Sequence, residues 1–126
     1  KLAAEYQEIL RKKEEDKKRQ EMESLRLKKQ AELDNINAHF ISVAQASNVA
    51  EANLRIQQTL TYYASPDIPV LLIIEIYGDN QKDYDRPTTI SHFLKYLKDV
   101  KTYNRKIESI KFDEYRKIIE VELINK

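Results

Sequence analysis

The chain has 126 residues, of which 22 are basic and 21 acidic, so its formal net charge is +1. This length suits one modest domain, and the balanced charge argues against a general binder of nucleic acid or anionic membranes, which would show a basic excess. The absence of cysteine excludes disulfides, thiolate zinc sites and cysteine nucleophiles. The single glycine, Gly78, excludes a glycine-rich phosphate loop.

The sequence leaves the cellular compartment open. A chain without cysteine suits the cytoplasm and the periplasm equally. The first residue is lysine rather than methionine, so we expect a processed product or a fragment. No stretch approaches the roughly 20 apolar residues of a membrane span.

Residues 1–47 are predicted to form one long, highly charged helix. They contain no Gly or Pro and are rich in Glu, Lys, Gln, Ala and Leu. Residues 11–21 hold no apolar side chain, so their helicity must rest on propensity and on ion pairs such as Glu14–Lys18, each contributing about 0.2–0.5 kcal/mol. We therefore expect a spacer or docking element rather than a core helix.

Two apolar stripes in this helix are predicted to dock. They consist of Leu2, Tyr6, Ile9 and Leu10, and of Leu33, Ile36 and Phe40. We expect the first stripe to dock on another chain and the second on the small domain that follows. The second stripe has heptad spacing over less than two heptads, which is too short for a long coiled coil.

A helix and a strand are predicted next. Asn48 is a suitable N-cap and Glu51 follows three residues later, as in a capping box, so a helix should extend to about residue 63. The prolines of "ASPDIP" end it. The run "VLLIIEIY", residues 70–77, is almost continuously apolar, which predicts a central strand covered on both faces, with Ile73 or Ile74 deeply buried.

A further helix and a hairpin complete the predicted elements. Asp85 or Thr88 is expected to cap the helix, with Pro87 at or just before its first turn. Its core-facing side chains are Ile90, Phe93, Leu94, Leu97 and Val100. In the hairpin, "DEYR" is the turn, and apolar residues then alternate with Glu120 and Glu122.

The order helix, strand, helix, strand, strand after residue 48 predicts an α+β fold with a small mixed or antiparallel sheet. The chain is thus expected to divide into an extended charged helix, residues 1–47, and a small α+β domain, residues 48–126.

The run from "LTYYASPDIPVLLIIEIY" to "DRPTTISHFLKYL" resembles the nuclear-transport-factor-like α+β fold over about residues 48–100. In that family a helix ends near an aromatic pair, a "PD" element leads into a strand, and a further helix closes a cone. The chain departs from the family after residue 100, where about 25 residues replace a long curved sheet. The resemblance places no catalytic residue in this chain.

Candidate metal and catalytic sites are weak. Asp79, Gln81, Asp83 and Asp85 have the spacing of a calcium loop, but Tyr84 stands where the loop needs glycine and Ile90 where it needs glutamate. Neither histidine has a partner at i+4, and nothing resembles a nucleophile elbow. We therefore predict no catalytic residue, no metal site and no cofactor.

Two functions are compatible with these patterns. The first is a non-enzymatic interaction or structural module that binds protein partners in a homo-oligomer or larger complex. The alternative is a small-molecule binding domain or enzyme with a tyrosine-lined pocket, since tyrosine offers an apolar ring with a polar tip. The candidate pocket residues are Tyr62, Tyr63, Tyr77, Tyr84, His92 and Tyr96.

Overall fold

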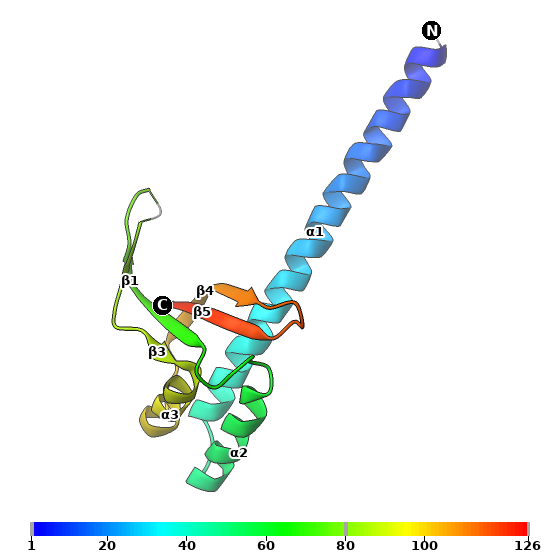
Figure 1. Cartoon of the computed structure of the whole chain (residues 1–126). Helices are drawn as coiled ribbons and strands as arrows, with labels where there is room; N and C mark the ends of the chain where they lie inside the picture. The colour runs from blue at the N-terminus through cyan, green and yellow to red at the C-terminus, as the bar shows by residue number, and fades with distance from the viewer. Residues whose placement is uncertain (1, 80, 126) are drawn as a thin grey trace. The chain divides into compact units, whose positions relative to one another are not determined.

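The computed structural model describes residues 2–79 and 81–125, with side chains from Ala3 onward. It has the predicted α+β architecture (Figure 1). The helices are α1 (Leu2–Ala44), α2 (Val49–Leu60) and α3 (Ile90–Val100), and the strands are β1 (Pro69–Ile76), β2 (Lys82–Tyr84), β3 (Thr88–Thr89), β4 (Arg105–Phe112) and β5 (Ile118–Asn125).

The chain forms two compact units, residues 1–35 and residues 36–126. This division differs from the expected one after residue 47, because the end of α1 belongs to the core of the second unit. Phe40 is fully buried there. Its ring meets that of Phe93 edge-on, with centroids 5.4 Å apart, and tilts against Tyr103 at 5.3 Å.

The first unit consists of helix α1 up to Asn35, and its ion pairs lie on its own surface. Arg11 pairs with Glu8 at 3.7 Å and Arg19 with Asp16 at 3.4 Å, both at i,i+3 spacing. Such exposed pairs each contribute only a few tenths of a kcal/mol, about 0.2–0.5. The helicity of this unit therefore rests mainly on residue propensity.

Helix α2 begins as the sequence predicts. Asn48 is the N-cap, and its side chain accepts a hydrogen bond of 2.8 Å from the backbone N–H of Glu51. The Glu51 carboxylate in turn accepts from the backbone N–H of Ser47 at 3.3 Å, one residue earlier than in the standard capping box. Ala52 and Ile56 then face the core.

The sheet has the strand order β2–β1–β5–β4, with β3 pairing along β1. Strand β1 is central, as predicted. It runs parallel to β5, where Val70 pairs with Val121, and the other pairings are antiparallel, so the sheet is mixed. Figure 1 shows β1, β5 and β4 side by side, although they come from distant parts of the sequence.

The prediction that β1 is covered on both faces is wrong for the second half of the strand, which is exposed from Ile74 on. The expected deep burial of Ile73 or Ile74 is confirmed at Ile73. Ile73 is 1% exposed, whereas Ile74 is 56% exposed. The register between β1 and β2 shifts between Ile73 and Glu75, so Ile74 falls at an irregularity and turns toward solvent.

Helix α3 begins one residue later than a cap at Thr88 would place it, and four residues later than a cap at Asp85. Its N-cap is Thr89, whose hydroxyl accepts a hydrogen bond of 3.2 Å from the backbone N–H of His92. Neither Asp85 nor Thr88 caps the helix, because Thr88 lies in β3 and pairs with Val70. Four of the five predicted core positions of α3 are buried, and Val100 is exposed.

Strand β2 was not predicted. Residues 78–83 hold no alternating apolar side chains that would indicate a strand. The strand forms through pairing with β1, in which Tyr84 lies opposite Ile73 and Lys82 opposite Ile76. Pairing with the strongly apolar strand β1 therefore stabilises β2, although the residues of β2 carry no strand pattern of their own.

Candidate functional site

The described surface of the first unit is exposed throughout residues 3–31. It nevertheless carries six large apolar side chains. They are Tyr6, Ile9, Leu10, Met22, Leu25 and Leu27, which are between 43% and 71% exposed. Scattered exposed apolar residues are normal, and the second unit has them too, but these six lie on a helix that has no core of its own.

The seven predicted docking residues are found in four situations. Tyr6, Ile9 and Leu10 are exposed, whereas the side chain of Leu2 lies outside the described residues. Leu33 belongs to the first unit. Ile36 and Phe40 are buried in the second unit, which is where the second stripe was expected to dock.

Met22, Leu25 and Leu27 were not predicted as docking residues. They lie within a run of charged residues whose low apolar content hid them. Their exposure makes the middle of α1 a candidate docking surface as well as its beginning. A count of apolar side chains at helical spacing would have found them.

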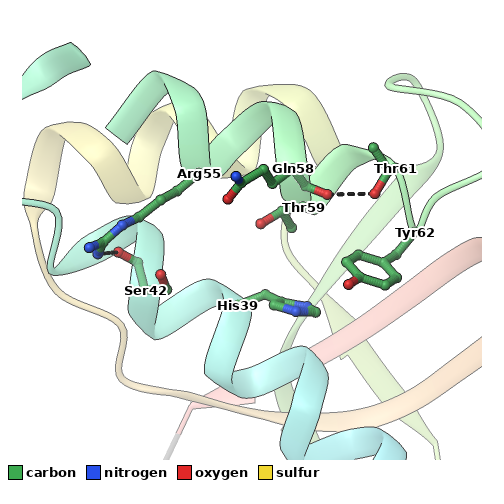
Figure 2. A pocket seen from close by; sticks show the side chains of 7 residues that line it. All are labelled: His39, Ser42, Arg55, Gln58, Thr59, Thr61 and Tyr62. Atoms are coloured by element: carbon green, nitrogen blue, oxygen red, sulfur yellow. Dashed lines mark hydrogen bonds between the residues drawn. The ribbon is translucent and has the colours of Figure 1, made fainter. Parts of the chain in front are cut away.

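A hollow of about 350 Å³ lies within the second unit, between the end of α1 and α2 (Figure 2). Its lining residues are His39, Ser42, Arg55, Gln58, Thr59, Thr61 and Tyr62. At one end the rings of His39 and Tyr62 stack, with centroids 4.6 Å apart. Burial lowers the pKa of His39, which favours its neutral form.

The polar groups of this hollow are largely engaged with each other. Arg55 donates a hydrogen bond of 2.7 Å to the backbone carbonyl of Ser42 and forms an ion pair with Glu51. The hydroxyl of Thr61 donates to the backbone carbonyl of Gln58 at 2.6 Å, as the dashed line in Figure 2 shows. A ligand here would have to displace the partners of the single arginine.

The six residues of the alternative pocket do not all meet at this hollow. Tyr62 lines it, whereas the other five do not. Tyr63 is buried, Tyr84 lies in β2, and His92 and Tyr96 are exposed on α3. Tyr77 follows β1 and is also exposed.

A second polar cluster is centred on Glu122 of β5, which is 7% exposed. Its carboxylate accepts hydrogen bonds from the hydroxyl of Ser109 at 2.5 Å, the hydroxyl of Tyr84 at 2.6 Å and the ammonium of Lys82 at 3.2 Å. Ser109 lies opposite Glu122 on β4. Lys82 and Tyr84 reach it from β2, across the width of β1. This burial was not predicted, because the alternating pattern of apolar residues places Glu122 on the outward face of its strand.

The environment of Glu122 sets its charge state. Burial alone would raise its pKa, but the hydrogen bonds from Ser109, Tyr84 and Lys82, with the positive charge of Lys82, outweigh burial and lower it. The hydrogen bond to Glu122 is the main cause that raises the pKa of Tyr84 to about 12. At neutral pH the cluster therefore holds an ionised carboxylate and a protonated phenol, and it ties β2, β5 and β4 together.

Two other features, a metal-binding cluster and a membrane-spanning helix, are absent from the residues that the structure describes. No group of three or more His, Cys, Asp or Glu side chains within residues 2–79 and 81–125 is arranged to hold a metal ion. Over the same ranges, no helix combines the length and apolar character that crossing a membrane requires.

Comparison with protein-family models, with curated proteins and with solved structures finds no match to this chain. The resemblance to the nuclear-transport-factor-like fold therefore stays a prediction.

Proposed function

We propose that this protein is a non-enzymatic interaction module that assembles, as a homo-oligomer or in a larger complex, through the first unit of α1. The observation that supports this proposal is the exposure of Tyr6, Ile9, Leu10, Met22, Leu25 and Leu27 along a helix without a core. Apolar surface of this kind gains free energy when a partner removes it from water.

The physics of isolated helices gives a second reason. A helix whose residues 3–31 are all exposed has no tertiary packing to hold it, and in water such helices are only marginally stable. Its surface ion pairs supply little, since exposed pairs contribute about 0.2–1 kcal/mol each. A partner that covers the apolar side chains would stabilise the helix while it docks.

The alternative function, small-molecule binding at a tyrosine-lined pocket, has weaker support. The hollow beside His39 contains one of the six candidate residues, Tyr62, and its arginine is already paired. We therefore prefer assembly through α1.

Light scattering on the full chain tests this proposal. The parent should scatter as a species heavier than the 14.9 kDa monomer, and a variant carrying Tyr6→Gln, Ile9→Gln and Leu10→Gln should return to monomer mass. A matched variant, Glu15→Gln with Lys18→Gln, should assemble like the parent because it keeps every apolar side chain. The proposal fails if the apolar variant assembles as strongly as the parent, and its homo-oligomeric form fails if the parent stays monomeric at millimolar concentration.

A further inference from the structure

One stripe of side chains runs the length of the first unit of α1. Its described members are Tyr6, Ile9, Lys13, Asp16, Gln20, Ser24, Leu27 and Ala31. They are three or four residues apart, with an average step of about 3.6 residues, which is the period of a straight α-helix, so all share one face. We call this face the seam. Its two ends are apolar and its middle is polar.

The ends of the seam offer most of its accessible apolar surface. Tyr6 and Ile9 at one end are 64% and 53% exposed, and Leu27 at the other is 55% exposed. A shallow hollow accompanies each end: one is bordered by Ala3, Tyr6 and Ile9, and the other by Ser24, Leu27 and Ala31. The apolar surface that a partner could cover thus lies at the two ends of the seam.

We propose that the partner of this seam is a second copy of the chain, lying antiparallel, with the two-fold axis between Asp16 and Lys17. This inference rests on the proposed function and names its partner. In this register Tyr6 faces Leu27 of the second copy, and the two-fold symmetry repeats the contact. Tyr6 therefore meets an apolar side chain, whereas Ile9 faces Ser24 and the polar residue Lys13 faces Gln20.

Charges beside the seam favour the same register. In an antiparallel helix pair, each flank of the seam meets the same flank of the other helix. This brings Lys12 beside Glu23 and Asp16 beside Arg19 of the second copy on one flank. On the other flank it brings Glu14 beside Lys17. All three contacts join opposite charges, and symmetry makes each of them occur twice. Within one chain, a guanidinium nitrogen of Arg19 lies 3.4 Å from a carboxylate oxygen of Asp16, so both side chains reach the same flank.

A parallel pair in register is disfavoured by the same residues. It would place Lys13 against Lys13 of the second copy in the middle of the interface. The antiparallel pair separates these two lysines, although Asp16 and Lys17 each lie near their own copy at its two-fold axis. Like charges held in contact oppose association. The three opposite-charge contacts thus favour the antiparallel arrangement, although residues 11–21 carry no apolar side chain.

Disulfide trapping tests the register, and the full chain suits it because it has no cysteine of its own. Lys13→Cys and Gln20→Cys are made as separate variants, mixed at equal concentration and oxidised. In the proposed pair these positions face each other. Positions 13 and 20 lie about 10 Å apart along one helix, beyond the reach of a disulfide, so neither variant alone should cross-link readily. We expect a covalent dimer yield several-fold higher in the mixture than in either variant alone.

A mixture of Glu15→Cys with Lys18→Cys serves as the control, since both positions lie away from the seam and should not cross-link. Sedimentation velocity of the parent chain is measured alongside. If the parent assembles but the Lys13→Cys variant alone cross-links as readily as the mixture, the antiparallel pair is overturned and the proposed function stands. If the parent sediments only as a monomer, the inference and the homo-oligomeric form of the proposed function both fail.

Discussion

The hydroxyl of Tyr84 donates a hydrogen bond of 2.6 Å to the carboxylate of Glu122, although the two residues lie on strands separated by β1. Lys82, which lies two residues before Tyr84 on β2, donates to the same carboxylate. The short strand β2 is therefore held by side chains that bridge its neighbour as well as by its own ladder. The stability of this edge of the sheet should depend on the charge of Glu122.

Acid should weaken the domain partly through Glu122. Its pKa is below the ordinary value of 4.5 in the folded state, so its contribution to stability is fully present above pH 4.5 and is lost as the pH falls through the lower folded value. Glu122→Gln should lower the melting temperature at pH 7 and flatten its decline below pH 4.5. Glu120→Gln, whose partner Lys111 is exposed, should keep the parent's acid slope. An unchanged slope in Glu122→Gln would contradict this role.

The two isoleucines in the middle of β1 should respond differently to truncation. Ile73→Ala removes a buried side chain and should cost about 2–5 kcal/mol of unfolding free energy. Ile74→Ala, next to it but 56% exposed, should change stability by no more than about 0.5 kcal/mol. Urea unfolding at equal ionic strength measures both. Equal losses in the two variants would contradict the difference in burial between Ile73 and Ile74.

The start of α3 should be sensitive at Thr89 alone. Thr89→Ala removes the acceptor for the backbone N–H of His92 and should cost about 1 kcal/mol, whereas Thr89→Ser keeps the hydroxyl and most of the stability. Asp85→Ala, at a residue that does not cap the helix, should cost less than Thr89→Ala. Thermal melts of the three variants measure these losses of stability. A larger loss in Asp85→Ala than in Thr89→Ala would indicate that Asp85 caps the helix instead.

The buried Tyr63 and the half-buried Tyr103 should behave in opposite ways when their hydroxyls are removed. The hydroxyl of Tyr63 is buried without a hydrogen-bond partner among the described residues, and a buried polar group without a partner is costly. Tyr63→Phe should therefore leave the melting temperature unchanged or raise it. Tyr103 donates a hydrogen bond of 2.6 Å to Asn37, so Tyr103→Phe should cost about 0.5–1.5 kcal/mol. A clear loss in Tyr63→Phe would show that its hydroxyl has a partner.

A charge reversal beside the seam should weaken the antiparallel pair, and a compensating reversal should restore it. Lys12→Glu turns two attractive contacts with Glu23 into repulsive ones, so the dissociation constant should rise about tenfold if each contact changes by roughly 0.5–1 kcal/mol. The double variant Lys12→Glu with Glu23→Lys should recover most of the affinity. Sedimentation equilibrium at low salt measures the three constants. A double variant no tighter than the single one would exclude this contact.

The sequence predicted those elements whose signal is local. The cap at Asn48, the apolar run of β1 and the spacing of Ile90, Phe93 and Leu97 each depend on neighbouring residues. These signals were enough for the α+β class and for the central place of β1.

The features that were missed depend on partners far along the chain. Strand β2 has no pattern of its own and forms on β1. Glu122 is buried in a cluster that includes Lys82, which lies 40 residues before it in the sequence. The alternating pattern of β5 therefore wrongly indicated an exposed side chain. Thr89 caps α3 because β3 extends the backbone up to that residue. Docking of Tyr6 and Ile9 on another chain stays a prediction.

The parallel pairing of β1 with β5 also constrains how the protein is made. Val70 meets Val121 only after 51 further residues have been added, and β5 lies inside the sheet rather than at its edge. During synthesis, β1 must therefore wait with one of its edges unpaired until residue 125 has left the ribosome exit tunnel. A nascent chain stalled before β5 would expose an apolar strand that is open to pairing with other chains.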